Sequence, residues 1–228
     1  MQLSERTLLR LHVEAVWGVQ LPAILHSDIT LSHESKQPSW KLCAAAISDD
    51  HVTIWRPDVH AAEREALLAR AHEALALPPK VATARNISRE VALQQVTSPT
   101  MDMTTVQQLA RPLTARDRSL LRAFQPNSEE YYLHTNRRPL IGVINEGRLL
   151  SLAHSSRRTT EACELGITTL PAARRKGYAL AATILWTATV TEEGLIPIYS
   201  ALIKNQASLS LASAAGYRIF AHIATITR

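Results

Sequence analysis

The chain has 228 residues, of which 46% are hydrophobic and 20% charged, a composition typical of a globular protein with one large or two small domains. Its net charge of +5 is modest and aromatic residues make up only 5%, so a nucleic-acid partner is not expected, whereas a polyphosphate ligand would suit the basic balance. No apolar run reaches the roughly 18 to 20 residues of a membrane span and no signal peptide is recognised at the start. Cys43 and Cys163 lie too far apart in sequence to suggest a disulfide framework or a metal site, which favours a cytoplasmic location.

Residues 1–100 predict an N-terminal α/β region. Its expected elements, in chain order, are a helix capped by Ser4 and running to about Trp17, a hairpin of strands 40–47 and 51–56, a helix over 59–77, and a further helix starting near 86–90. Residues 97–104 are rich in Thr, Ser, Pro and Met and predict a linker.

Residues 104–228 predict a second α/β region. Its expected elements are a strand over 106–113, a helix over 115–124 capped by Thr114 with Asp117 at its third position, a short helix over 128–133, a hairpin of strands 140–144 and 149–154, a strand over 164–169, a helix over 180–190, a strand over 196–203, a short helix capped by Asn205, and a last strand over 217–225.

The most informative segment joins the strand over 164–169 to the helix that follows it. A helix N-terminus presents free backbone N–H groups and the positive end of the helix dipole, which together bind phosphate. Gly177 lets the backbone come close to a ligand, and Arg174, Arg175 and Lys176 add positive charge. The alternative interpretation is an ordinary basic helix start with a tolerated glycine.

Two motifs resemble those of the GNAT superfamily of N-acetyltransferases. Arg174-x-x-Gly177-x-Ala179, preceded by Leu170-Pro171, is similar to the acetyl-CoA-binding motif. Asn205, followed by a small residue, a short helix and the pair Gly216-Tyr217, is similar to the second signature. The resemblance covers roughly residues 104–228, and the surrounding residues are most similar to the branch that includes zwittermicin-resistance-type acetyltransferases.

The resemblance implies a GNAT acyltransferase fold, an α/β fold with a mixed sheet, and acetyl-CoA as co-substrate without a metal. The residues that it nominates for cofactor binding are Thr168, Thr169, Leu170, Arg174, Arg175, Lys176, Gly177, Tyr178, Ala179, Asn205 and Ser208. In this interpretation the backbone of 168–170 runs beside the pantetheine arm like an added strand.

The catalytic residues implied by the resemblance are Glu164, Leu170 and Tyr199. The N–H of Leu170 would stabilise the oxyanion, and Glu164 would contact the substrate amine, with proton transfer as a further role. The alternative for Glu164 is an ion pair with Arg157 or Arg158, and His154 is a second candidate base.

The protonation of the CoA thiolate departs from the family pattern. Ala212 occupies the position where many GNAT enzymes carry a tyrosine. Tyr199 is the expected substitute, and the alternatives are a packing role for Tyr199 and protonation by water.

These observations predict an acetyl-CoA-dependent N-acetyltransferase acting on a primary amine, with a small molecule as the expected acceptor and a homodimer through the last strands as the expected assembly. One alternative is a catalytically degenerate GNAT protein that senses acyl-CoA. The N-terminal region is interpreted either as a degenerate GNAT-like half, or as a cap that shapes the acceptor pocket or a dimer contact. A third possibility is a recognition domain for a macromolecule.

Overall fold

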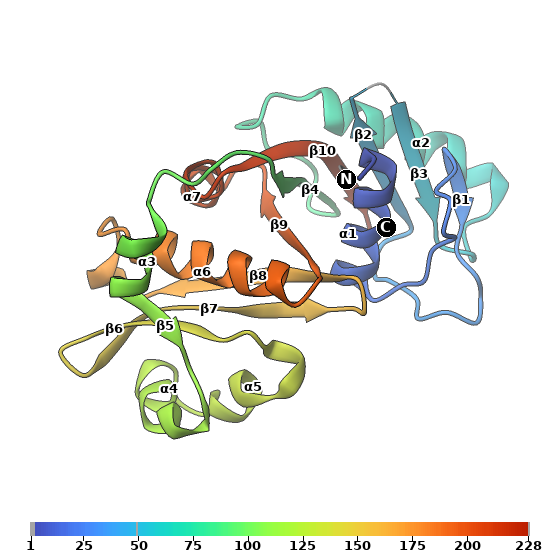
Figure 1. The fold of residues 1–228 in the computed structure, drawn as a ribbon. Helices are drawn as coiled ribbons and strands as arrows, with labels where there is room; N and C mark the ends of the chain where they lie inside the picture. Colours follow the sequence, from blue (N-terminus) through green and yellow to red (C-terminus); the bar gives the residue numbers. More distant parts are fainter. Residues whose placement is uncertain (1–2, 49, 228) are drawn as a thin grey trace. The chain divides into compact units, whose positions relative to one another are not determined.

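The computed structural model describes residues 3–48 and 50–227 (Figure 1). The turn expected at Asp49 therefore lies outside the described residues, as do the first two residues of the expected mature start. The chain folds into two compact units. The first consists of the described residues of Met1–Gln94, Ser200–Leu209 and Arg218–Arg228, and the second consists of Gln95–Tyr199 and Ser210–Tyr217. The units are discontinuous in sequence, whereas the sequence suggests a division near residue 100.

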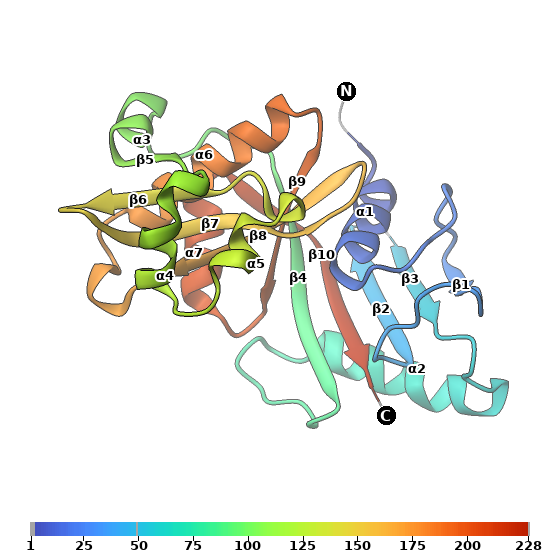
Figure 2. The same cartoon turned by 90° about the horizontal axis from the view of Figure 1, so that it is seen from below.

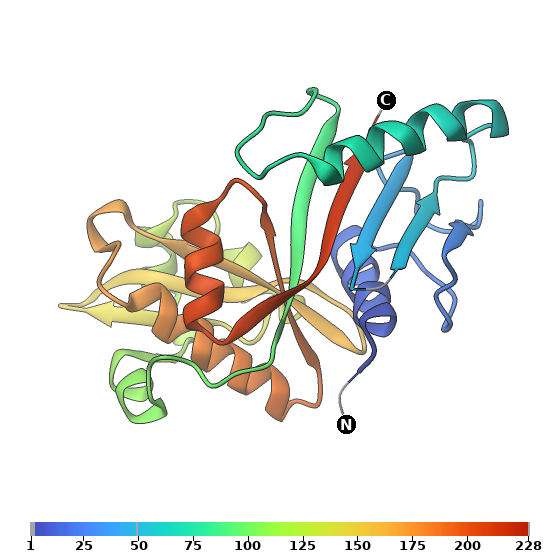
Figure 3. The same cartoon turned by 90° about the horizontal axis from the view of Figure 1, so that it is seen from above.

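The first unit contains a mixed sheet and two helices. Its elements are α1 (Glu5–Trp17), β1 (Asp28–Thr30), β2 (Leu42–Ile47), β3 (Asp50–Trp55), α2 (Ala61–Ala76), β4 (Ile87–Gln95), the end of β9 (Ile196–Leu202) and most of β10 (Tyr217–Ile226). The strand order is β1-β3-β2-β10-β4 followed by β9. Helix α2 packs Leu67 and Ala71 against Leu42 and Ile226 of the sheet (Figure 3).

The structure confirms the first helix and the hairpin of this unit. The Ser4 hydroxyl accepts the N–H of Thr7 at 3.2 Å, as expected of an N-cap, and β2 pairs with β3 in antiparallel fashion. The helix expected to start near 86–90 is wrong, because β4 occupies that segment. Its buried residues Arg89, Val91 and Leu93 alternate with more exposed ones except at Ala92, and β10 and β9 lie on its two sides.

The second unit carries an antiparallel sheet that ends in one parallel pair. Its elements are α3 (Met103–Leu109), β5 (Ala110–Pro112), η1 (Ala115–Asp117), α4 (Arg118–Phe124), α5 (Glu129–Leu133), η2 (Thr135–Arg137), β6 (Ile141–Asn145), β7 (Arg148–Arg158), β8 (Ala162–Thr169), η3 (Pro171–Ala173), α6 (Tyr178–Glu192), the start of β9 and the end of α7 (Gln206–Ala214). The strand order is β5-β6-β7-β8-β9, and β9 is parallel to β8.

Helices cover both faces of this sheet. Helix α6 packs on one face through Ala181 and Trp186, while α4 and α5 pack on the other through Leu121 and Tyr132 (Figures 1 and 2). Because side chains alternate along β7, Ala153 faces α6 and Leu152 faces α4 and α5.

From β5 onward the order of strands and helices is the one predicted, so the α/β class with a mixed sheet is confirmed. The predicted capping box of Thr114 and Asp117 is also present. The strand expected over 106–113 is wrong in its first half, where α3 extends to Leu109. Asp102 caps that helix by accepting the N–H of Thr105 at 2.9 Å, which favours the helix over an extended strand. Among the described residues, no helix is both long and apolar enough to cross a membrane.

Candidate active site

The strand β8 is paired along the whole of one edge but along only part of the other. Beside β9 the parallel register joins Ala162 to Ile196, Cys163 to Pro197 and Glu164 to Ile198. Within the described chain no further pair continues this register, although β8 extends to Thr169. On the opposite edge, β7 pairs with β8 as far as Thr169. The edge of β8 beyond Glu164 is therefore available for another extended chain.

The register with β7 determines which backbone groups face this open edge. The N–H of Leu170 donates to the carbonyl of Leu150 at 3.0 Å, so it points toward β7. In an antiparallel pair the N–H groups of alternate residues point to opposite edges. Since Leu170 and Thr168 point toward β7, the N–H groups of Ile167 and Thr169 point toward the open edge. The expected use of Leu170 as oxyanion donor is therefore corrected, because the neighbouring strand already takes up its N–H.

The loop after β8 turns the chain into α6 through two residues of left-handed backbone. Arg175 has a φ of 62° and Gly177, which precedes the first helical residue, has a φ of 78°. An added Cβ at Gly177 would meet only the methyl carbon of Met101 at 3.2 Å, so backbone conformation rather than space is the main reason for glycine here.

The first turn of α6 provides the expected anion-binding groups. The first intrahelical hydrogen bond runs from the N–H of Ala181 to the carbonyl of Gly177 at 2.9 Å. The N–H groups of Tyr178, Ala179 and Leu180 therefore have no acceptor within the helix. Arg174, Arg175 and Lys176 are exposed just before them, and no salt bridge within the described residues involves any of the three.

Asn205 and Ser208 belong to the first unit, whereas the loop belongs to the second. The side-chain oxygen of Asn205 accepts the N–H of Ser208 at 3.2 Å. Asn205 is thus the N-cap of α7, as predicted.

Glu164 lies on the face of β8 opposite to α6. Its side chain is buried, with 9% of the residue exposed, and Ser156 donates its hydroxyl to Oε2 of Glu164 at 2.9 Å. Arg137, at the end of η2, donates from Nη1 to the backbone carbonyl of the same Ser156. Arg158, one of the two arginines considered as a partner of Glu164, instead pairs with Glu193 at 2.9 Å.

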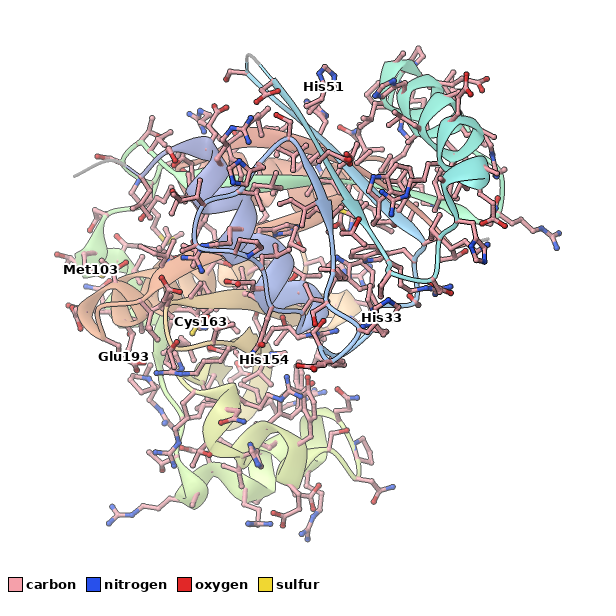
Figure 4. All side chains as sticks on the ribbon, turned by 90° about the vertical axis from the view of Figure 1, so that its right-hand side faces the viewer. His33, His51, Met103, His154, Cys163 and Glu193 are labelled. Atoms are coloured by element: carbon pink, nitrogen blue, oxygen red, sulfur yellow. The ribbon has the colours of Figure 1, made fainter. Side chains whose placement is uncertain are left out.

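His154 occupies the same face, directly across from Gly166 (Figure 4). A Cβ at Gly166 would lie 2.4 Å from Cε1 of His154, so the glycine is required for the ring to lie over the strand. The ring also stands edge-on to Tyr131 and Tyr132, with centroid separations of 5.7 and 5.1 Å. The hydroxyl of Tyr131 lies 3.4 Å from Nε2.

The imidazole of His154 is neutral at physiological pH. Burial lowers its pKa to about 4, and the nearby Arg137 guanidinium acts in the same direction. Its Nδ1 is buried and has no hydrogen-bond partner in the described structure. The aromatic and arginine residues around His154 were missed from the sequence, because they come from segments that no motif connects.

Tyr199 follows the last residue of β9 that is paired with β8. It is buried, and its ring lies 5.4 Å from that of Tyr217, whose hydroxyl is 2.8 Å from that of Thr187. Because Ile198 and Glu164 are register partners, alternation places Tyr199 on the α6 face, opposite to Glu164. Ala212 is fully buried, so no hydroxyl is available from that position.

A separate cavity of about 390 Å³ lies in the first unit. It is lined by residues 79–85, the start of β4 and residues 202–204. Its charged lining residues are all basic, but the most buried of them, Arg89, donates to the backbone carbonyls of Leu77, Pro78 and Val81. Arg89 therefore holds the loop after α2 in place, and the cavity contains none of the expected site residues.

A parallel strand pair that separates beside a glycine-containing helix start defines an acyltransferase class, in which an extended cofactor arm fits between the strands and its phosphates bind the helix. The family profile described as GNAT acetyltransferase matches residues 60–222. The chain therefore belongs to the GNAT acetyltransferase family and is an acyltransferase of that type.

Solved structures show the same fold at low sequence identity. A GNAT-family acetyltransferase from Colwellia psychrerythraea is 15% identical with a TM-score of 0.53, and the match covers 81% of this chain and 80% of that one. A GNAT-family protein from Novosphingobium aromaticivorans DSM 12444 is 20% identical with a TM-score of 0.49, over 64% and 68% of the two chains. An aminoglycoside N-acetyltransferase solved with CoA is 18% identical with a TM-score of 0.41, over 49% and 92%. No curated protein sequence matches the chain.

Proposed function

We propose that this protein transfers the acetyl group of acetyl-CoA to a primary amine of a small molecule. The observation that carries the proposal is the edge of β8 beyond Glu164, which is unpaired and leads directly into the loop and the N-terminus of α6. An extended arm attached to a pyrophosphate fits this combination, because the strand edge offers peptide groups and the helix offers unpaired N–H groups.

In this proposal the pyrophosphate binds at Arg174 to Ala179 and the pantetheine arm runs along β8. Thr168 and Thr169 lie beside the arm, and Leu170 forms the turn into the loop. The exposed cations Arg174, Arg175 and Lys176 add attraction to the phosphates. Asn205 and Ser208, at the start of α7, remain proposed contacts to the arm.

The thioester must lie at the end of the arm that is remote from the phosphates. Going back along β8 from the loop, the first N–H facing the open edge belongs to Thr169 and the next to Ile167. We therefore assign the Thr169 N–H to the pantetheine and the Ile167 N–H to the oxyanion, in place of Leu170. This assignment brings the thioester carbonyl close to Glu164, three residues earlier.

The reaction then uses both faces of β8. The amine nitrogen attacks the thioester carbonyl carbon, a C–N bond forms, and the C–S bond breaks to release the CoA thiolate. Glu164, on the α4 and α5 face, anchors the amine and takes its proton as it attacks. Tyr199, on the α6 face, is the proposed proton donor to the thiolate.

A second function is favoured by one specific observation. Ala212 provides no hydroxyl at the position of the usual tyrosine, and Tyr199 is buried against Tyr217. A protein that binds acyl-CoA without turning it over, as a sensor, would tolerate this arrangement. Binding without thiol release would support it.

A free-thiol assay with acetyl-CoA and a panel of amines tests the proposal. We expect thiol release that depends on the amine and forms one amide per thiol, identified by mass spectrometry. Binding of acetyl-CoA without release on any amine would favour the sensor, and failure to bind acetyl-CoA would contradict both functions.

The remaining parts of the proposal concern the setting of the enzyme. Cys43 and Cys163 are both free and buried, which is compatible with a reducing compartment such as the cytoplasm. A homodimer through the last strands stays a prediction, which sedimentation would test. The role of the N-terminal region, as a degenerate GNAT-like half or as a cap, also remains a proposal.

A further inference from the structure

A cluster of aromatic and basic side chains surrounds Glu164 on the face opposite to α6. It consists of Tyr131 and Tyr132 from α5, Arg137 from η2, and His154 and Ser156 from β7; we call it the Tyr-Arg cluster. Its members are connected by the contacts of His154 with both tyrosines and of Ser156 with both Arg137 and Glu164. None of these residues takes part in the cofactor site described above.

Arg137 is held in a fixed position but keeps unused hydrogen-bonding capacity. Its guanidinium lies 4.1 Å from the ring centroid of Tyr131, and Nη1 donates to the carbonyl of Ser156. No salt bridge within the described residues involves Arg137, and no hydrogen bond there uses its other nitrogens. A guanidinium has five N–H donors, so several remain for a planar anion such as a carboxylate.

The charges near Glu164 also favour an acceptor that is not purely cationic. Arg157 is the register partner of Glu164 and is exposed, and Arg138 follows Arg137 and is also exposed. Arg158 is balanced by Glu193, but Arg137 has no such partner in the described chain. A polyamine would approach more guanidinium groups than carboxylates here, whereas an amine that also carries a carboxylate would be attracted.

His154 and Tyr131 add neutral polar groups to the same place. The buried Nδ1 of His154 has no partner in the described structure, and Tyr131 is 43% exposed although its hydroxyl approaches His154. Because the imidazole is uncharged, it can donate or accept one hydrogen bond without adding to the local positive charge. The buried unpaired nitrogen is a second, independent indication that a polar ligand binds on this face.

We propose that the acceptor is an amino acid or a similar amino-carboxylate, whose carboxylate binds Arg137 while its amine points to Glu164. This inference rests on the proposed acetyltransferase function. Ser156 fixes the spacing, because its carbonyl accepts from Arg137 while its hydroxyl donates to Glu164. A single residue thus bridges the two anchors, and an amine close to a carboxylate matches that short separation.

Matched pairs of acceptors test the proposal. Phenylalanine, leucine and lysine are compared with their decarboxylated amines and with their methyl esters, which keep the side chain and lose the negative charge. We expect kcat/KM to favour the free amino acids by about 10-fold to 100-fold, the effect of one charge-assisted contact. A preference for peptides ending in the same residue would indicate a protein C-terminus as the source of the carboxylate.

Arg137→Ala should remove this preference mainly by raising KM, and Arg137→Lys should restore part of it, because lysine keeps the charge but not the planar fork. Arg116→Ala is the control, since Arg116 is an exposed arginine in η1 that donates no side-chain hydrogen bond within the described residues. A loss of preference in Arg116→Ala as well would contradict a specific role for Arg137.

Two binding measurements separate this inference from the proposed function. Calorimetry with acetyl-CoA tests the function alone. Titration of histidine-labelled protein with each amino acid, with and without CoA, follows the ring resonance of His154, assigned with His154→Gln. Shifts that saturate and require Arg137 would support the inference even without turnover. Equal turnover of amines and amino acids, or no shift of the His154 resonance with any amino acid, would overturn it.

Discussion

The two sides of β8 achieve recognition by different means. Toward β9 and α6, the proposed cofactor side is built from backbone groups: the outward N–H groups of the strand, the left-handed residues of the loop and the first turn of a helix. Toward α4 and α5, the proposed acceptor side is built from side chains that come from α5, η2, β7 and β8.

This difference explains which side a family can share and which side it can vary. Backbone groups are largely independent of side-chain identity, so a cofactor common to many enzymes is well served by a strand edge and a helix N-terminus. Side chains on short helices and loops change with few constraints on the fold, so they suit an acceptor that differs between enzymes. The predictions below test whether the two sides respond separately.

The largest effect should come from Gly177→Glu. The substitution forces a β-carbon onto a φ of 78° and places a negative charge where the phosphates are proposed to bind. We expect acetyl-CoA affinity to fall by at least about 100-fold, a loss of roughly 3 kcal/mol or more, measured by calorimetry.

Gly194→Glu is the matched control, because Gly194 follows the other end of α6 with a φ of 76° and open space around it. It imposes the same backbone strain without touching the proposed site. Equal loss of affinity in both variants would mean that strain, and not phosphate binding, is responsible.

Glu164→Gln should separate the two sides of β8. If Glu164 takes the proton of the amine, kcat should fall by about 10²-fold, because the amide cannot act as a base. Affinity for acetyl-CoA should remain unchanged, since the side chain lies on the opposite face. Steady-state kinetics over a range of pH values provides the measurement, with the exposed Glu192→Gln as control. An unaltered kcat and pH–rate profile would remove Glu164 from proton transfer.

Gly166→Ala should disturb the acceptor side through packing. The new methyl group would lie 2.4 Å from Cε1 of His154, so the ring must move. We expect the free energy of unfolding to fall by about 2 to 3 kcal/mol, as for an overpacked site, with little change in acetyl-CoA affinity. Gly147→Ala, at a turn with open space, should cost only about 1 kcal/mol through its positive φ. Urea denaturation of both variants decides the matter, and equal costs would contradict the packing argument.

The smallest effect is a pH dependence carried by His154. Burial lowers its folded-state pKa to about 4, below the usual value of 6.5, so the unfolded chain binds the proton more readily. Stability is therefore full above the unfolded pKa and is lost as the pH falls from about 6.5 toward 4. Between about pH 7 and pH 5 we expect a loss of roughly 1 to 2 kcal/mol that His154→Gln abolishes. His222, whose pKa burial also lowers, is present in both proteins and cancels in the difference. Parallel slopes for the two proteins would exclude His154 as the cause.

Local features of the fold and the cofactor side could be predicted from the sequence. The loop at Gly177, the N-cap at Asn205 and the capping box at Thr114 each depend on residues within a few positions of one another. Features that depend on distant partners could not. The segment over 87–95 becomes a strand because it lies between β10 and β9, which come more than 100 residues later.

The same reasoning applies to the candidate site. The outward direction of the Ile167 N–H follows from the register with β7, which no motif in β8 encodes. The Tyr-Arg cluster joins three separate segments, so its residues look unrelated in the sequence until the sheet and α5 bring them together. His154 was recognised only as a second candidate, because the glycine that accommodates its ring lies on another strand.

The central claim is that the open edge of β8 and the start of α6 bind acetyl-CoA, and calorimetric titration of the full-length protein with acetyl-CoA tests it most directly. The account predicts saturable binding with one site per chain, weakened by added salt because the phosphates meet exposed cations, lost in Gly177→Glu and retained in Gly194→Glu. Absence of saturable binding up to millimolar acetyl-CoA, in protein shown by circular dichroism to be folded, would contradict it.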